Sequence, residues 1–260
     1  NGLDTVFEEY KLTASMVKQV RHGTTVASNA ILERKGAKTG LIGSKGFRDV
    51  LEIRTLRMPR LYDLAWTKPP ALVERFLRVT VDERVNSAGD VVKPLTVKEG
   101  ERAVRKLIDE KVESIAVCLI NSYANPEHEF LLKSVIERLA PDLPFSISAE
   151  VLPEIREYER TSTTTINAYV KPIVSEYLET LEAGLIASGI NAELLLMQSN
   201  GGLTPVETAA KLPMNIIESG PAGGVVGARL LAEKAKLGDL ITFDMGGTTA
   251  KASMVERGEY

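Results

Sequence analysis

The sequence contains little of what several common protein classes require. Its single cysteine, Cys118, excludes a disulfide within the chain and fits a reducing, cytoplasmic compartment. No apolar run approaches the ~18–20 residues that cross a bilayer, and the first residues, NGLDTVFEEY, lack the basic start and apolar block of a signal peptide. The net charge of −3 comes without a long basic run, which argues against nucleic acid and anionic membranes as partners.

Histidine is scarce, and two familiar nucleotide-binding motifs are absent. With only two histidines, a His-based zinc site or a Ser-His-Asp triad has little material. His128 stands at the start of an expected helix, in NPEHE, and is predicted to lie on the surface. No GxxxxGK[ST] motif occurs, so the chain has no P-loop, and SGPAGG (219–224) does not match the dinucleotide-binding pattern GxGxxG.

Short apolar runs alternate with amphipathic segments along the chain, which predicts an α/β architecture. Strands are expected at 39–44, 114–121, 144–151 and 193–202. Helices are expected at 22–36, 96–111, 126–140, about 155–188 with an interruption near Pro172, and 204–212 with Thr204 as its cap. A strand, a glycine loop and a helix are expected over 214–236, and strands with irregular loops over 55–94. Helices follow strands repeatedly, so part of the sheet should be parallel. Cys118, in the apolar run SIAVCLIN, is expected to pack as a small core hydrophobe.

The stretch LITFDMGGTTAKASM (240–254) places an acid at the end of an apolar strand and two glycines in the turn that follows. Glycine allows positive φ and has no Cβ to obstruct a phosphate, so consecutive backbone N–H groups can form an anion-binding concavity. Asp244 would hold Mg²⁺ through water, because magnesium keeps much of its hydration shell. The residues predicted to bind phosphate are Gly246, Gly247, Thr248 and Thr249. The alternative is an ordinary β-hairpin whose turn has no chemical role.

A second glycine-rich segment, SGPAGG, precedes a helix expected to begin near Val225. A glycine loop that leads into a helix N-terminus is a potential anion site. Close packing of the helix on a sheet favours the same residues, so both interpretations stay open. The glycines concerned are Gly220, Gly223 and Gly224.

Two polar segments allow a functional and a structural interpretation. In EIREYERTSTTTINAYVKP (154–172), Arg160 precedes a hydroxyl run of poor helix propensity, which suits either a substrate-facing helix end or a buried helix contact. In HGTT, His22 and Thr24 bring an imidazole and a hydroxyl to a site, or they form structural hydrogen bonds.

Five motifs in a fixed order together resemble a known family: HGTTVASNAILERKGAKTGLI, REYERTSTTTINAYVKP, LMQSNGG, ESGPAGGVVGA and DMGGTTAK. Their sequence and order resemble the hydantoinase/oxoprolinase family, which includes ATP-dependent N-methylhydantoinases, 5-oxoprolinases and the ATP-binding subunits of acetone-type carboxylases. The resemblance covers the chain from about Arg21 to its end. Five ordered motifs are far more specific than DxGGT alone.

The resemblance implies the actin-like ATPase superfold, in which two ribonuclease-H-like domains hold a nucleotide between them and each contributes a phosphate hairpin. By that likeness, residues 1–168 are most of the first domain, without its first phosphate hairpin. Residues 169–260 are the start of the second domain and end in its hairpin. The chain thus resembles an internal piece of a longer protein and is not expected to hydrolyse ATP by itself.

For the whole protein, the resemblance implies a hydrolase that uses ATP and Mg²⁺ to open a cyclic amide of the hydantoin or 5-oxoproline type through a phosphorylated intermediate. A second subunit of the hydantoinase B type, or a homo-oligomer, is the implied partner. Asp244 would organise metal and water, and Lys251 would add positive charge. Because their motifs match those of the family, four further residues are candidates for lining the site: His22, Thr24, Arg160 and Asn200.

Other activities share the same hairpin chemistry. One is the ATP-binding subunit of an acetone- or acetophenone-type carboxylase. Another is a small-molecule kinase of the same superfold. An actin- or chaperone-like ATPase that changes shape with nucleotide, and a degenerate binding module, are the non-enzymatic alternatives.

Overall fold

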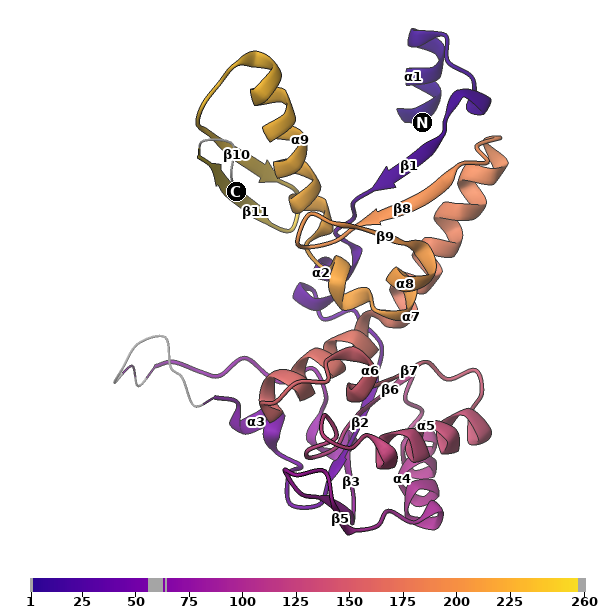
Figure 1. The fold of residues 1–260 in the computed structure, drawn as a ribbon, viewed down its shortest axis with the longest axis vertical. Coiled ribbons are helices and arrows are strands. Elements are labelled where there is room, and N and C mark those ends of the chain that lie inside the picture. The colour runs from indigo at the N-terminus through magenta and orange to yellow at the C-terminus, as the bar shows by residue number, and fades with distance from the viewer. Residues whose placement is uncertain (1, 56–62, 64, 257–260) are drawn as a thin grey trace. The chain divides into compact units, whose positions relative to one another are not determined.

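The computed structural model describes residues 2–55, 63 and 65–256, which form two compact units (Figure 1). One consists of residues 36–172 and is called the 36–172 unit below. The other joins residues 1–35 to residues 173–260 and is called the split unit. Among the described residues, no helix is long and apolar enough to span a membrane. Helices alternate with parallel strands in both units, which confirms the expected α/β class.

The 36–172 unit is built on a parallel four-stranded sheet in the order β3-β2-β6-β7. Every residue of β6 is buried, as expected for a parallel strand covered on both faces. The apolar core of this unit is made by residues between Leu41 and Ala168. The strands are β2 (Thr39–Ser44), β3 (Arg78–Val81), β6 (Ser114–Cys118) and β7 (Phe145–Ile147).

Two helices, α4 (Val97–Asp109) and α5 (Glu127–Leu139), pack against each other in this unit (Figure 1). The side chain of Thr96 accepts a hydrogen bond from the backbone N–H of Glu99 and caps α4. A Cβ at Gly40 would lie 2.7 Å from the methyl groups of Leu107, so this close approach of strand and helix requires glycine. The smaller elements are α3 (Val50–Ile53), α6 (Ser148–Val151), and the antiparallel pair β4 (Arg84–Val85) and β5 (Val91–Lys93).

The split unit contains a three-stranded sheet and a separate β-hairpin. In the sheet, β1 runs parallel to β8, and β9 is antiparallel to β8. In the hairpin, β10 pairs antiparallel with β11. The strands are β1 (Gln19–His22), β8 (Glu193–Met197), β9 (Leu203–Pro205), β10 (Leu240–Met245) and β11 (Ala250–Val255), and the helices are α1 (Gly2–Tyr10), α2 (Val26–Leu32), α8 (Val206–Lys211) and α9 (Ser219–Ala235).

The helix α7 (Glu157–Ala187) contributes residues to both units and passes through Pro172 without a break, so the predicted interruption there is wrong. Proline removes one backbone donor from a helix, and packing along the rest of a long helix can compensate for that loss. Three threonines of the hydroxyl run of α7 are buried, which favours a helix contact over a substrate-facing helix end: Thr161, Thr164 and Thr165. Thr161 donates to Cys118 Sγ at 3.2 Å, and the Nδ2 of Asn167 donates to Ser146 at 3.0 Å.

Several predicted boundaries are wrong because local sequence did not reveal tertiary contacts. No strand precedes α9: a 3-10 turn occupies Pro213–Ile216, and the helix begins at Ser219 and so includes the glycines that were expected to form a loop. Thr204 does not cap α8 but pairs with Leu196 in the sheet. Four other elements are shorter than predicted: α2 begins only at Val26, β6 ends at Cys118, β7 ends at Ile147 where α6 follows, and β8 ends at Met197.

Two further expectations for the fold hold where the structure describes the chain, whereas the division into domains at residues 168 and 169 stays a prediction. Strands and irregular segments were predicted for 55–94, and β3, β4 and β5 lie there, while residues 56–62 and 64 are outside the described residues. Cys118 is a buried core residue, as predicted, and burial raises the pKa of its thiol to about 12.

Candidate functional site

The hairpin predicted to bind phosphate is present in the split unit. Asp244 lies near the end of β10, opposite Lys251 on β11. The turn is closed by a hydrogen bond of 2.9 Å from Gly246 N–H to the Thr249 carbonyl. A Cβ built at Gly246 or at Gly247 would meet no atom within 4 Å, so the space beside the turn is open to an approaching anion.

Thr248 in this turn donates a hydrogen bond of 3.1 Å to the Glu33 carboxylate, just after α2. Glu33 also pairs with Lys35 at 2.6 Å. These two partners, Lys35 first, hold the pKa of the Glu33 carboxyl below its usual value. The hydroxyl of Thr248 is therefore engaged within the split unit, whereas the glycine backbone beside it is not crowded by neighbours.

Charged side chains lie next to the turn of the hairpin. Lys251 forms an ion pair with Glu218, the residue that immediately precedes α9. A cavity of about 260 Å³ is lined by Asp244 and Lys251 on the hairpin and by Gly224 and Val225 on α9. A carboxylate, an ammonium group and a helix position without a side chain, Gly224, thus border one cavity.

The start of α9 is held by the loop that follows β1. Ser219 Oγ accepts from the Thr24 N–H at 3.0 Å and donates to the Thr24 carbonyl at 2.9 Å, and Gly220 N–H donates to the same carbonyl at 3.2 Å. A Cβ at Gly23 would lie 2.9 Å from the Ser219 carbonyl oxygen. Close packing therefore accounts for Gly23 and Gly220, the second of which was predicted to bind a cofactor.

The other two glycines of the segment lie within α9 and are less constrained. A Cβ at Gly223 would be 3.8 Å from Met197, and one at Gly224 would meet nothing within 4 Å. Gly224 borders the 260 Å³ cavity, so its lack of a side chain widens that space.

A second cavity, of about 390 Å³, lies at the carboxyl end of β8. Ser199, Asn200 and Gly201 form one wall, and Glu218 with the first turns of α9 forms another. The side-chain oxygen of Asn200 accepts the Gly202 N–H at 2.9 Å, which fixes the orientation of its amide. The volume lies within the range of small-molecule pockets, about 300–1,000 Å³.

His22 lies at the carboxyl end of β1 in the same unit. Its Nε2 is 2.6 Å from the Tyr177 hydroxyl of α7. Burial lowers the pKa of the imidazole, so the neutral form is favoured. Neither cavity described above is lined by His22 or Thr24.

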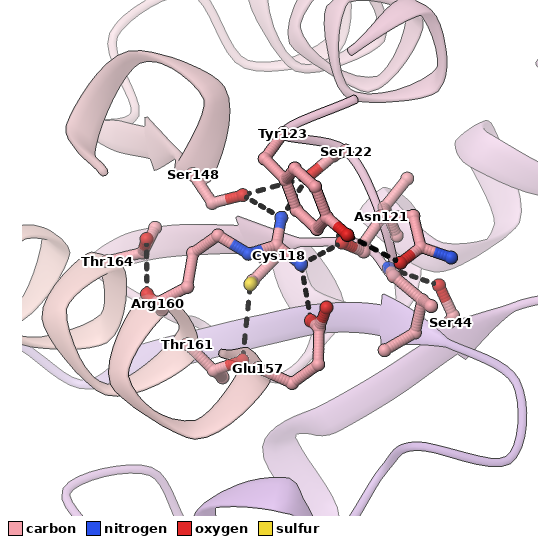
Figure 2. A network of polar contacts seen from close by, with 12 residues as sticks. Ser44, Cys118, Asn121, Ser122, Tyr123, Ser148, Glu157, Arg160, Thr161 and Thr164 are labelled. Carbon is pink, nitrogen blue, oxygen red and sulfur yellow. Dashed lines mark hydrogen bonds and ion pairs between the residues drawn. The ribbon is translucent and has the colours of Figure 1, made fainter. Parts of the chain in front are cut away.

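Arg160 belongs to the 36–172 unit, where it is fully buried in a network of polar contacts (Figure 2). Its guanidinium donates to the Leu119 carbonyl at 2.7 Å and to Ser148 at 3.0 Å, and it also contacts Ser122 and Glu157. These contacts join the start of α7 to the segment after β6 and to α6. In the structure, Arg160 stabilises the interior of its unit and is not exposed to solvent.

Sequence reasoning missed two buried acids, Glu83 and Glu129, and misplaced His128. His128 was expected on the surface but is buried, because its Nδ1 contacts Glu83 at 2.7 Å and its Nε2 accepts the Leu95 N–H at 3.1 Å. Glu83 also accepts from Ser44. Glu129, the other buried acid of this interior, accepts the Leu119 N–H at 2.8 Å. No local sequence pattern marks these residues, because their partners come from distant segments. Glu218 could have been noticed as the acid directly before SGPAGG.

The hairpin suits a magnesium ion held jointly with phosphate. Among the described residues, no group of three or more His, Cys, Asp or Glu side chains is arranged to hold a metal. Asp244, which the sequence predicts to bind a metal, offers a single carboxylate beside an open turn. Magnesium is commonly held by one or two carboxylates together with substrate phosphates and water, so this donor set fits a metal–nucleotide complex.

Comparisons with known proteins agree with the order of motifs in the sequence. Residues 1–140 match the family described as hydantoinase/oxoprolinase N-terminal region, and residues 160–260 match the family described as hydantoinase/oxoprolinase. Caprolactamase subunit alpha of Pseudomonas jessenii is 35% identical over 91% of this chain and 34% of its own length. 5-oxoprolinase 1 of Arabidopsis thaliana is 34% identical over all of this chain and 22% of its own length.

Two solved structures share the fold. The ATP-dependent caprolactamase from Pseudomonas jessenii superposes with a TM-score of 0.85 at 32% identity, covering 98% of this chain and 38% of that one. Nucleotide-free acetone carboxylase superposes with a TM-score of 0.81 at 29% identity, and the match covers 92% of this chain and 35% of that one. The chain thus spans about a third, or less, of the length of the proteins it matches.

Proposed function

The chain belongs to the hydantoinase/oxoprolinase family, and from this premise we propose that it supplies the second phosphate hairpin of an enzyme that uses ATP to open a cyclic amide. The single observation that supports this most strongly is the hairpin itself, with Asp244 near the end of β10 and an uncrowded glycine turn after it. Under this proposal residues 1–168 and 169–260 correspond to the family's first domain and the start of its second.

The proposed reaction begins when the γ-phosphoryl group of ATP passes to the carbonyl oxygen of the cyclic amide. This transfer leaves ADP and an O-phosphorylated ring whose carbon is more electrophilic. Attack by one water on that carbon allows the C–N bond to break, and a second water releases phosphate. The protein has little covalent chemistry to do, so positioning and charge neutralisation dominate.

The residues at and beside the turn of the hairpin have specific roles in that scheme. The backbone N–H groups of Gly247 and Thr248 would hold phosphate oxygens, because that of Gly246 closes the turn, and Lys251 would neutralise negative charge. Asp244 would hold Mg²⁺, which supplies charge stabilisation on the phosphates when it is bound. The cavity beside Asn200 would accept the ring. His22 and Thr24 do not line this cavity, and a role for them in the reaction stays a prediction from the sequence.

One experiment tests this proposal in the full-length natural protein, purified with any subunit that accompanies it. ADP release is measured with Mg²⁺ and ATP in the presence of 5-oxoproline, hydantoins, caprolactam, or a ketone with bicarbonate. We expect one cyclic amide to stimulate release, and Asp244→Ala to reduce the stimulated rate by about 10²–10³-fold, as for loss of one preorganised electrostatic contact. Glu207→Gln, which removes an acid from α8 of the same unit, is the matched control.

The other outcomes separate the alternatives. Stimulation by a ketone with bicarbonate, and not by any amide, would favour a carboxylase, the activity named for one of the two superposed structures. Rapid release regardless of the added compound would favour a conformational ATPase. Absence of release with every compound would contradict the proposed enzyme. A partner subunit, as the name caprolactamase subunit alpha suggests for that relative, would be identified by co-purification.

A further inference from the structure

The two cavities of the split unit adjoin each other. Pro221, Val225 and Ser253 border both of them. Glu218 borders only the larger cavity, at the end of β8, and Lys251 borders only the smaller one, beside Asp244. The ion pair between Glu218 and Lys251 therefore bridges from one cavity to the other.

We propose that Glu218 is a positioning residue that keeps Lys251 in a closed state until a phosphate group displaces its carboxylate. In the closed state the ion pair separates the two cavities. When a phosphate oxygen takes the ammonium group of Lys251, the pair opens and the cavities become continuous. This inference rests on the proposed function, because it assigns the hairpin a nucleotide phosphate as ligand.

The exposure of the pair makes such an exchange feasible. The side chain of Lys251 is 24% exposed and that of Glu218 is 48% exposed. Ion pairs this open to water are weak. A phosphate carries more charge than a carboxylate and offers several acceptor oxygens, so it competes effectively for an ammonium group.

Backbone contacts hold Glu218 in place, so Lys251 is the partner that moves. The N–H of Glu218 donates to Ser199 Oγ at 3.1 Å, and the carboxylate lies at the N-terminal end of α9, where the helix dipole favours negative charge. Glu218 can therefore remain in place after release. Lys251 carries a flexible four-carbon stem and has Asp244 opposite it on β10, so its ammonium group can turn toward a phosphate held at the hairpin.

The test measures dissociation constants for Mg²⁺ complexes of ADP and of a non-hydrolysable ATP analogue, in the full-length protein, by calorimetry. Glu218→Gln removes the competing carboxylate at nearly constant shape, so we expect nucleotide binding to become roughly two- to fivefold tighter, the range set by a weak exposed pair. Glu218→Ala should act in the same direction. Lys251→Met should weaken binding. Glu207→Gln, a matched loss of one acid that borders neither cavity, should change nothing.

The decisive comparison uses a Lys251→Met background. If Glu218 acts through Lys251, Glu218→Gln has no effect there, whereas a general effect of removing negative charge would persist. Unchanged or weaker binding by Glu218→Gln, or an equal effect in both backgrounds, would overturn this inference while leaving the proposed function intact. If the wild-type protein bound no nucleotide, both proposals would fail together.

Discussion

Glu129 and Arg160 are two fully buried charged residues in the 36–172 unit. The carboxylate of Glu129 accepts backbone N–H groups of Leu119 and Ala149, each at 2.8 Å, and also the hydroxyls of Ser122 and Ser148. The same two serines contact Arg160, so they link the acid to the cation. Burial nevertheless raises the pKa of Glu129 above its ordinary value of 4.5, because desolvation outweighs these favourable contacts.

This raised pKa predicts a specific dependence of stability on pH. Above pH 4.5, and up to its native pKa, Glu129 binds its proton more tightly in the folded protein than in the unfolded chain. The folded state then carries more protons, so the contribution of this group to the free energy of unfolding falls as the pH rises. Glu129→Gln removes that contribution and costs about 1–3 kcal/mol, because an amide cannot accept all of these bonds.

We therefore expect the difference in stability between wild type and Glu129→Gln to shrink as the pH is raised from 4.5 toward neutrality. Urea unfolding of both proteins at several pH values measures that difference directly. Glu127→Gln, which changes an exposed acid at the start of the same helix, controls for general effects of charge. A difference that widens with pH would show that the native pKa of Glu129 lies below its ordinary value.

Two glycines, Gly184 and Gly36, are expected to respond in opposite ways to an added methyl group. Gly184 lies in the exposed part of α7, where an added Cβ would meet nothing within 4 Å. Gly36 lies before β2, where an added Cβ would be 2.1 Å from a ring atom of Tyr169. The first position has room for a methyl group, and the second does not.

From this contrast we expect Gly184→Ala to stabilise the protein by about 0.5–1 kcal/mol, because alanine loses less backbone entropy in a helix. Gly36→Ala should destabilise it by about 1–3 kcal/mol, since the Tyr169 ring must move to make space. Denaturant midpoints of the two variants, measured side by side, check both signs. Equal midpoints would contradict this account of the packing around Tyr169.

At the scale of elements, sequence patterns were most informative where the structure depends on nearby residues. The amphipathic helix α4 and the hairpin β10–β11 follow directly from periodicity and from turn residues. The predictions failed where distant segments decide the outcome. The helix α9 begins at Ser219 because the Ser219 side chain forms hydrogen bonds with the backbone of Thr24, which is distant in sequence. His128 is buried because Glu83 and Leu95 satisfy both of its ring nitrogens. The same holds for the candidate site. The hairpin could be predicted from its own sequence, whereas the ion pair between Lys251 and Glu218 could not, because the two residues are distant in sequence.

At the scale of the whole molecule, the division into two units predicts which part of the chain folds alone. The main apolar core lies entirely within the 36–172 unit, together with the parallel sheet β3-β2-β6-β7. The first part of α7 completes this interior, because Ala168 belongs to the core and Arg160 joins the segment after β6 to α6. Residues 36–172 thus contain every partner of the buried network in Figure 2.

We expect a fragment of residues 36–172 to unfold cooperatively, and a shorter fragment of residues 36–151 to be largely unfolded at 25 °C. The shorter one keeps Glu129 but loses Arg160, and leaving one partner of a buried charged network costs about 3–5 kcal/mol. That loss approaches the lower end of the stability of a small domain, about 5–15 kcal/mol, and the apolar contacts of Ala168 are lost in addition. Circular dichroism during thermal unfolding distinguishes the two fragments. An Arg160→Met variant of the longer fragment separates loss of the cation from loss of the helix, and equal stability of all three would mean that α7 is dispensable to this core.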